Sequence, residues 1–404
     1  MIRIPIAMFV LALSLAVGVA CSVSAQRPEN DGIVTLASDA ETRWVPFDLT
    51  PGNQIRFQMS VDGKPVTAIL DTGVSYSVIA RQSHAVDATR VRSNGSATAI
   101  GGAVPIGWMA TKTLRIGGLD RSGGGLSVAD LPALATGSAR AVDLLIGRDI
   151  TGDQALDIDY PNHRFRLIAS GRMPFRGAVA PLTVSPGRRL YESAITLGGR
   201  RLSPVVIDTG DGSAITVSAS AWRTAAPKGV STTSAVSFGL AGPTVNELAV
   251  VPDVRVGGNA GRDAEVRIEP KGGFSDTIGV AGRIGSGFFQ RYRVLLDPAA
   301  GRMVLAPGKD ADDPILRSTS GLLVGIEPDP TPARLKVLHV MQGSPAAAAG
   351  WRDGDEICSV DGNRIMSDYA ASPLARWSVG TPGRVVRLGL CSGTTRALTL
   401  ASFY

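Results

Sequence analysis

The sequence predicts a mainly β protein made of two similar lobes followed by a smaller β-rich domain. Three observations support this prediction: a composition rich in turn-forming residues, a segment that occurs twice, and a change of composition after Leu305. The chain has 404 residues, whereas a single domain usually has ~100–200. Its 48 glycines, 25 prolines and charged share of 19% suit many short strands and turns better than long helices.

Residues 1–25 are predicted to be a signal peptide that is removed from the mature chain. Arg3 precedes an apolar run over residues 4–20, and Val23-Ser24-Ala25 has the small residues of a cleavage site. The alternative is cleavage before Cys21, which would then carry a lipid and tether the protein to a membrane. In both cases we expect a periplasmic or secreted protein.

Charge and metal-ligand spacing argue against two other classes of function. The formal net charge of +6 comes from scattered arginines, without a basic run interleaved with aromatic residues, so nucleic acid is not an expected partner. The three histidines, and the two cysteines beyond Cys21, show no metal-ligand spacing, so we expect no metal and no cofactor. Those cysteines, Cys358 and Cys391, could form a disulfide in an oxidising compartment, but the sequence leaves their pairing open.

One element occurs twice along the chain. An apolar run ends in Asp71-Thr72-Gly73, and a second ends in Asp208-Thr209-Gly210, so the two aspartates are 137 residues apart (208 − 71 = 137). Downstream, Leu145-Ile146-Gly147 recurs as Arg283-Ile284-Gly285, with an offset of 138 between the final glycines (285 − 147 = 138). A nearly constant offset indicates a duplication, and we predict lobes over residues 45–180 and 181–306.

The duplicated motif supplies one carboxylate at the end of each apolar strand. Two carboxylates a few ångströms apart share one proton, so one can activate water while the other protonates the substrate. The threonine of each motif can hydrogen-bond to the partner loop, and the glycine lets the backbone approach closely. We therefore predict Asp71 and Asp208 as catalytic residues. The residues predicted to support them are Thr72, Gly73, Thr209 and Gly210.

A glycine-containing segment follows each Asp-Thr-Gly, over residues 94–102 and 237–243. Both segments fit the tip of a hairpin that could fold over a cleft. For the second segment, a surface turn without a role in the cleft is an equally good interpretation.

These motifs resemble those of the aspartic peptidases, specifically the bacterial retropepsin-like group. In these families Asp-Thr-Gly supplies the catalytic aspartate, and a later hydrophobic-hydrophobic-Gly packs behind it. The resemblance covers roughly residues 45–305, including a lead-in strand pair at Val61-Asp62-Gly63-Lys64-Pro65. It implies a two-lobed, aspartic-peptidase-like β-barrel pair. It also implies an aspartic endopeptidase that works as a monomer on peptide bonds of envelope or extracellular proteins.

Two positions depart from the family pattern. The residue after each Asp-Thr-Gly is Val74 in one half and Asp211 in the other, whereas pepsins often have a hydroxyl residue there that holds the carboxylate pKa down. We interpret Asp211 as an exposed turn residue beside Gly212. The alternative is that Asp211 faces the pair and raises its pKa further by like charge. We expect a mildly acidic to near-neutral pH optimum.

The segment after Leu305 has a different character. Residues 307–317 are polar and turn-rich, as in a linker, and residues 318–404 form a separate unit. Within it, Ser344-Pro345-Ala346, Gly354-Asp355-Glu356-Ile357 and Asp361-Gly362 resemble a bacterial PDZ domain. The resemblance implies capture of peptide C-termini by added-strand pairing. The peptide-binding residues it implies are Gly321, Leu322, Leu323 and Val324.

The main alternative function is a binding protein, in which a peptidase-like cleft that no longer cuts works with the PDZ-type domain as a peptide-recognition scaffold. Both motifs keep their aspartate, threonine and glycine, which favours the enzyme, because an inactive relative would most simply have lost one aspartate.

Overall fold

The computed structural model describes residues 32–137, 140–327 and 332–404, and these residues are mainly β, as the sequence predicts. The predicted signal peptide and Cys21 lie outside the described residues. Within the described ranges, no helix is long and apolar enough to cross a membrane.

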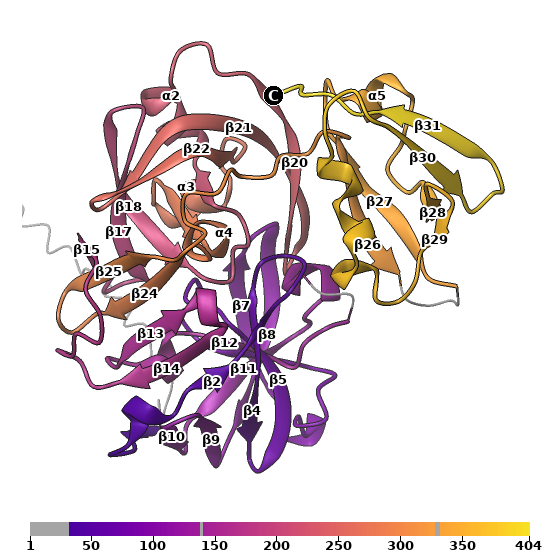
Figure 1. The fold of residues 1–404 in the computed structure, drawn as a ribbon. Helices are drawn as coiled ribbons and strands as arrows, with labels where there is room; N and C mark the ends of the chain where they lie inside the picture. The colour runs from indigo at the N-terminus through magenta and orange to yellow at the C-terminus, as the bar shows by residue number, and fades with distance from the viewer. Residues whose placement is uncertain (1–31, 138–139, 328–331) are drawn as a thin grey trace, which may run out of the picture.

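The first large sheet, at the bottom of Figure 1, contains β5, whose end carries Asp71. Its strand order is β1-β10-β9-β4-β5-β12-β6-β11-β8-β7, with β3 paired to β4. Alternate residues of β4 are buried, because successive side chains of a strand point to opposite faces. The strands are β1 (Ile33–Leu36), β3 (Asp48–Leu49), β4 (Ile55–Val61), β5 (Lys64–Leu70), β6 (Val78–Ala80), β7 (Arg92–Ala99), β8 (Gly102–Ala110), β9 (Thr113–Ile116), β10 (Leu119–Ser122), β11 (Gly125–Ala129) and β12 (Leu144–Ile146).

The second large sheet lies above the first in Figure 1 and contains β18, which ends at Asp208. Its order is β16-β17-β18-β23-β19-β22-β21-β20. The strands are β16 (Thr183–Val184), β17 (Tyr191–Leu197), β18 (Arg200–Asp208), β19 (Ile215–Val217), β20 (Thr232–Gly239), β21 (Gly242–Val256), β22 (Asn259–Ile268) and β23 (Gly282–Gly285). The short helices of the two halves are α1 (Arg148–Thr151), α2 (Ala219–Ala225), α3 (Phe274–Ile278) and α4 (Ser286–Phe289).

The two large sheets repeat one topology. Seven strands of the first, β4-β5-β12-β6-β11-β8-β7, correspond in order to β17-β18-β23-β19-β22-β21-β20 of the second. The directions also match: the β5–β12 and β6–β11 pairs are parallel, as are β18–β23 and β19–β22. The repeat seen in the sequence is therefore a repeat of structure.

A third sheet joins the two halves, with the order β15-β25-β24-β13-β14-β2. Its central pair, β13 and β24, is antiparallel. Outward from this pair the order is β13-β14-β2 on one side and β24-β25-β15 on the other, so each half contributes equivalent strands. A pseudo-twofold axis thus passes between β13 and β24, and one hydrophobic core extends across both halves. The strands are β2 (Val45–Pro46), β13 (Ala155–Asp159), β14 (Arg164–Ile168), β15 (Ala178–Pro181), β24 (Tyr292–Asp297) and β25 (Arg302–Pro307).

The C-terminal unit has its own sheet and its own core, which includes Leu335, Trp351 and Trp377. Residues 308–321, which connect it to β25, contain neither helix nor strand. The sheet order is β26-β27-β28-β30-β31, with β29 paired to β28, and a disulfide joins Cys358 to Cys391. The elements are β26 (Leu322–Glu327), β27 (Arg334–Val340), α5 (Pro345–Ala348), β28 (Glu356–Val360), β29 (Asn363–Arg364), β30 (Val385–Leu390) and β31 (Thr395–Thr399).

The C-terminal unit docks on β20 of the second large sheet, beside which β27 lies in Figure 1. The Thr233 hydroxyl donates to the Gln342 carbonyl at 2.7 Å, and the Ser234 hydroxyl lies 2.8 Å from His339 Nε2. At the chain end, the Tyr404 hydroxyl donates to Glu265 at 2.6 Å. Because β20 forms one arm of the hairpin β20–β21, the unit contacts an element whose tip reaches the site described next.

Candidate active site

Each predicted catalytic aspartate stands where a central strand ends. Asp71 follows β5, and Asp208 is the last residue of β18. Behind Asp71, β12 runs parallel to β5 and is followed by Gly147. Behind Asp208, β23 runs parallel to β18 and ends at Gly285. A Cβ atom on either glycine would overlap the backbone of the facing loop, at the carbonyl of Val74 or of Asp211. Only glycine lets the strand pack directly behind the aspartate loop.

The two threonines link the aspartate loops symmetrically. The Thr72 amide donates to Thr209 Oγ1 at 3.0 Å, and the Thr209 amide donates to Thr72 Oγ1 at 3.0 Å. The hydroxyls in turn donate to the carbonyls of Ile207 and Leu70, both at 2.7 Å. Each hydrogen bond contributes about 1 kcal/mol net. Because both threonines are buried, the four bonds fix one loop against the other.

The glycine of each motif makes room for the opposite carboxylate. A Cβ atom on Gly73 would overlap the Asp208 carboxylate, and a Cβ atom on Gly210 would overlap that of Asp71. Each glycine also donates its amide to its own aspartate, Gly73 to Asp71 at 3.0 Å and Gly210 to Asp208 at 3.1 Å. The structure thus brings all six residues predicted from the two motifs into one site, in which the aspartates and threonines are buried.

The environment favours the protonated form of the carboxyl pair. Burial, followed by the nearby charge of Asp208, raises the pKa of Asp71 well above its usual value. Burial and the charge of Asp211 raise the pKa of Asp208 to about 6, against the opposing effect of the Arg283 guanidinium. Two acidic groups in this position hold a proton at a pH at which isolated aspartates would be ionised.

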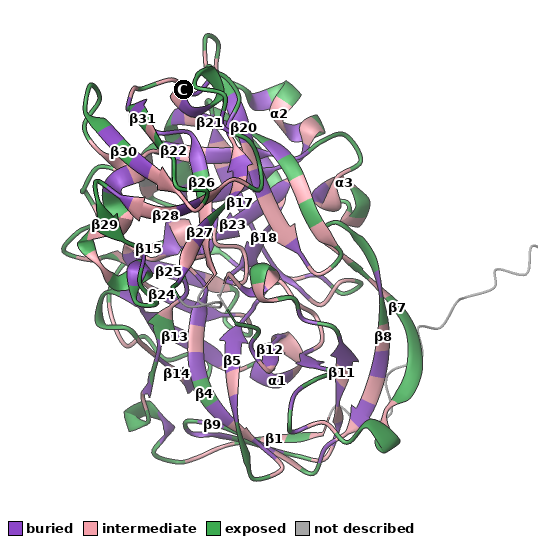
Figure 2. Ribbon diagram, turned by 90° about the vertical axis from the view of Figure 1, so that its right-hand side faces the viewer, coloured by how far each residue is buried: buried purple, intermediate pink, exposed green. Residues whose placement is uncertain are grey.

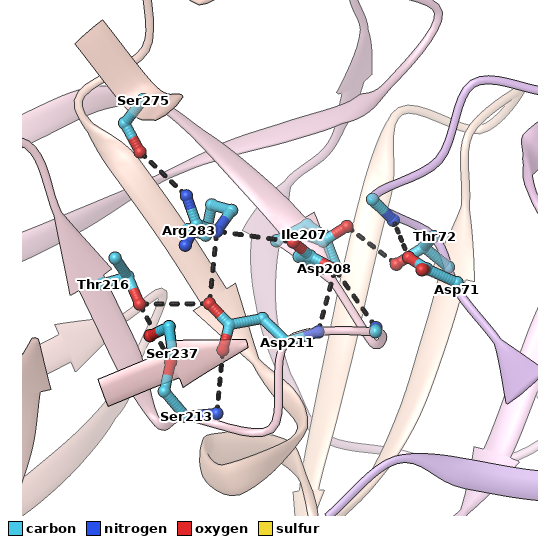
Figure 3. Close-up of polar contacts among 12 residues, drawn as sticks. Asp71, Thr72, Ile207, Asp208, Asp211, Ser213, Thr216, Ser237, Ser275 and Arg283 are labelled. Atoms are coloured by element: carbon cyan, nitrogen blue, oxygen red, sulfur yellow. Dashed lines mark hydrogen bonds and ion pairs between the residues drawn. The ribbon is translucent and has the colours of Figure 1, made fainter. Parts of the chain in front are cut away.

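A buried ion cluster adjoins Asp208, as Figure 3 shows. Arg283 is only 2% exposed, and its Nε lies 3.4 Å from Asp208 Oδ2 and 3.1 Å from Asp211 Oδ2. Its Nη1 lies 2.6 Å from Glu269 Oε1 and donates to the Ser275 hydroxyl at 3.1 Å. One guanidinium therefore contacts three carboxylates, one of which is a predicted catalytic group.

The interpretation of Asp211 as an exposed turn residue is wrong. Its side chain is buried and accepts hydrogen bonds from the Ser213 amide at 2.9 Å, the Thr216 hydroxyl at 3.0 Å and Arg283 at 3.1 Å. Burial raises the pKa of Asp211, but Arg283 and the other donors outweigh it and lower the pKa to about 2. Asp211 is thus an anion beside Asp208, the alternative that the sequence had left open.

Sequence reasoning missed Arg283 and Glu269 as parts of the site. A signal was present, because Arg283 interrupts an apolar pattern at the position where the first half has Leu145. Their partners could not be read from the chain, since Asp211, Glu269 and Arg283 come from separate segments that only the sheet order brings together.

Both predicted hairpin tips meet each other. The tips of β7–β8 and β20–β21 are joined by a hydrogen bond of 3.3 Å from the Ala241 amide to the Ile100 carbonyl. Gly239 packs so closely on Ile100 that a Cβ atom there would overlap it. Residues 237–243 thus form a hairpin tip that contacts the first hairpin. Most of β7 is exposed up to the tip (Figure 2).

A cavity of about 430 Å³ lies between the tip of β7–β8, the hairpin β20–β21 and the ion cluster. Ile100 and Gly101 line it from the first tip, and Arg283, Glu269 and Phe274 line it from the second half. Asp71 and Asp208 are not among its lining residues, and Arg283 is the residue that both lines the cavity and contacts Asp208. Among the described residues, no three His, Cys, Asp or Glu side chains are arranged to hold a metal ion.

The predicted peptide-binding residues of the C-terminal unit lie together, apart from the aspartate site. Leu322, Leu323 and Val324 begin β26, the edge strand of the fourth sheet, and Gly321 precedes them. The Gly321 amide donates to the Ser318 hydroxyl at 3.0 Å. Leu323 is 40% exposed.

Comparison with protein-family models gives a match to the first half. A family model described as aspartyl protease matches residues 57–150. No curated protein matches the chain. The matched segment includes Asp71-Thr72-Gly73 and Leu145-Ile146-Gly147, and it ends before the second half. Residues 57–150 are therefore similar to an aspartyl protease domain, which supports a peptidase activity at this coarse level.

Proposed function

We propose that the protein is an aspartic endopeptidase in which Asp71 and Asp208 form the catalytic pair. The observation that carries this proposal is the mutual fit of the two motifs, in which each glycine makes room for the opposite carboxylate. A pair that shares one proton can act as base and acid in the same step. Burial of both groups extends the pH range in which one proton remains.

The proposed reaction is hydrolysis by one water molecule. The ionised carboxylate takes a proton from water while the water oxygen bonds to the peptide carbonyl carbon. The protonated carboxyl gives its proton to the carbonyl oxygen, which yields a tetrahedral diol. The first group then passes its proton to the amide nitrogen as the C–N bond breaks. The second group recovers a proton from a hydroxyl, and the pair returns to its starting state.

The arrangement of the two large sheets supports a two-lobed, aspartic-peptidase-like barrel pair over residues 45–306. Both aspartates belong to one chain, so a monomer would hold the complete site. The hairpin tips, which contact each other near a cavity lined in part by Arg283, would cover a bound peptide. Opening of the tips would then admit the substrate, since they contact each other here.

For the C-terminal unit we propose a PDZ-type domain that binds peptide C-termini. β26 is an edge strand and leaves one side open for an added strand. A terminal carboxylate would compete with the Ser318 and Ser320 hydroxyls for the amides of Gly321 and Leu322. The proposed location is periplasmic or secreted, with cleavage after Ala25 or lipidation at Cys21. Intact mass of the mature chain distinguishes the two.

The decisive experiment compares the mature protein with Asp71→Asn and Asp208→Asn variants on a peptide library from pH 4 to 8. Loss of either group should lower kcat/KM by about 10²–10⁴-fold. Asp120→Asn, at a carboxylate whose side chain is 57% exposed, is the matched control and should cut like the unaltered protein. If the unaltered protein and Asp71→Asn behave alike, without pepstatin-type inhibition, the peptide-binding scaffold is the better explanation.

A further inference from the structure

The two aspartates stand in opposite electrostatic surroundings. The register of the strands shows which residues of the two halves correspond. In the first half Leu145 of β12 pairs with Val78 of β6, and in the second half Arg283 of β23 pairs with Thr216 of β19. Arg283 therefore occupies the position of Leu145, directly beside the strand that ends at the aspartate. An arginine replaces a buried leucine at the same place in a duplicated sheet.

The neighbouring positions also change from apolar residues in the first half to polar or charged residues in the second. Asp211 follows its Asp-Thr-Gly as Val74 follows the other motif. Glu269 comes directly after β22, at the register of Ala129 in β11. Val74, Val78, Ala129 and Leu145 belong to one apolar cluster. Their counterparts Asp211, Thr216, Glu269 and Arg283 form a hydrogen-bonded, charged cluster.

The titratable groups around Asp208 come from four segments. Asp71 faces it from the end of β5, and Asp211 from the loop after β18. Glu269, which follows β22, binds Arg283, and the charge of Arg267 on β22 adds to that of Arg283 in lowering the pKa of Asp211. The guanidinium of Arg283 on β23 is the cation at 3.4 Å from Asp208. Asp71 has apolar Val74, Val78 and Leu145 on the corresponding side.

Amide donors add to the difference. Asp208 Oδ1 accepts two backbone amides, from Gly210 at 3.1 Å and Asp211 at 3.0 Å. Asp71 Oδ1 accepts one, from Gly73 at 3.0 Å. Hydrogen bonds from amides and a nearby cation both favour the ionised form of a carboxyl, and the negative charge of Asp211 opposes them.

We propose that Arg283 is a positioning residue that keeps the negative charge of the pair on Asp208 and thereby leaves the shared proton on Asp71. This inference rests on the proposed function and assigns the roles of base and acid to individual aspartates. Asp208 takes the proton from water as the new C–O bond forms, and Asp71 gives its proton to the carbonyl oxygen. Asp208 then passes its proton to the leaving nitrogen, and Asp71 regains one from the diol. Arg283 transfers no proton.

The test is ¹³C NMR of the aspartate carboxyl carbons as a function of pH, assigned by comparison with Asp71→Asn and Asp208→Asn. In the unaltered protein, with one proton on the pair, Asp71 should show the shift of a carboxylic acid and Asp208 that of a carboxylate. The reverse assignment, or equal sharing, overturns the proposal. This readout needs no peptide cleavage, so its failure is distinct from failure of the proposed function.

Two variants test the part played by Arg283. Arg283→Gln removes the cation but keeps Asp211, so it should bring the two carboxyl shifts closer together. Arg283→Lys keeps the cation and should keep them apart. A folded Arg283→Gln variant, as circular dichroism would show, that keeps the full separation overturns the role of Arg283. If Arg283→Gln does not fold, the double variant Glu269→Gln, Arg283→Gln, which buries one charge fewer, gives the same comparison.

Catalysis provides a second readout of a positioning role. Because a cation near a carboxylate shifts its pKa by about 1–3 units, Arg283→Gln should move the acid limb of the kcat/KM profile to higher pH by about 1 unit. Arg283→Lys should restore most of that shift. An unchanged limb in a folded, active Arg283→Gln variant contradicts the proposal.

Discussion

The first and second halves build the same strands around the same motif, but they surround it with opposite chemistry. Behind Asp71 lies an apolar cluster with Leu145, and beside Asp208 lies Arg283 with its carboxylate partners. Replacing a buried ion cluster by apolar residues of similar size is often neutral or stabilising. The proposed chemistry of Asp208 therefore explains the charges of the second half better than stability does.

The feature that both halves share should be the most sensitive to mutation. Gly73→Ala and Gly210→Ala each put a methyl group into the opposite carboxylate, so the pair must move apart. A displacement of about 1 Å can cost 10²-fold in rate, and we expect kcat/KM to fall by at least about that factor for both. Steady-state kinetics measures it. Gly187→Ala, where a Cβ atom meets nothing within 4 Å, is the control. Unequal effects of the two variants would break the symmetry assumed here.

Stability should distinguish the two halves next. Arg283→Leu leaves Asp211 and Glu269 buried without their cation, which should lower the free energy of unfolding by about 3–5 kcal/mol. The converse change, Leu145→Arg, buries a cation among apolar residues and should cost a similar amount. Denaturant unfolding measures both. The triple variant Asp211→Val, Glu269→Ala, Arg283→Leu, which also removes both carboxylates, should recover most of the loss. If Arg283→Leu alone leaves the free energy of unfolding unchanged, the stability of the two buried carboxylates does not depend on Arg283.

The pH dependence of kcat/KM should report the different pKa values of the two aspartates. With Asp208 as base, activity needs its ionised form, so kcat/KM should rise with pH through the Asp208 pKa of about 6. At higher pH it should fall when Asp71 loses the proton that its raised pKa retains. Initial rates across a pH series test this bell shape. A maximum near pH 3, well below the acid limb, would contradict the raised pKa of Asp208.

The smallest expected effect concerns the second hairpin, which the C-terminal unit contacts at Ser234 through His339 and the Gln342 amide. Ser234→Ala removes bonds worth about 1 kcal/mol each and should speed amide hydrogen exchange in β20. Exchange in β7 is the internal reference and should not change. Equal protection of β20 in both proteins would show that this contact does not restrain the hairpin.

Local patterns in the chain were enough to predict a mainly β protein, its internal repeat and the two Asp-Thr-Gly segments that the structure brings together. Apolar runs that end in Asp-Thr-Gly at a constant offset led to the two aspartates, and the threonine and glycine roles followed from their size and hydrogen-bonding groups. The hairpin tips were predicted from glycine-containing segments. That the tips touch, through Ala241 and Ile100, was not predictable, because their separation depends on the placement of whole sheets.

The surroundings of the site depended on contacts that no local pattern encodes. Asp211 beside Gly212 has the sequence of an exposed turn, yet β19 and β23 bring Thr216 and Arg283 to it, and Arg283 in turn binds Glu269, which follows β22. In the same way, the pairing of Cys358 with Cys391 follows from strand neighbours.

The sequence by itself determined which residues could do the chemistry, because strand periodicity, glycine positions and a duplicated motif are local properties of the chain. Only the tertiary structure decided how the two aspartates differ. The pKa of a buried carboxyl depends on the charges within a few ångströms, and here those charges come from segments far apart in the sequence.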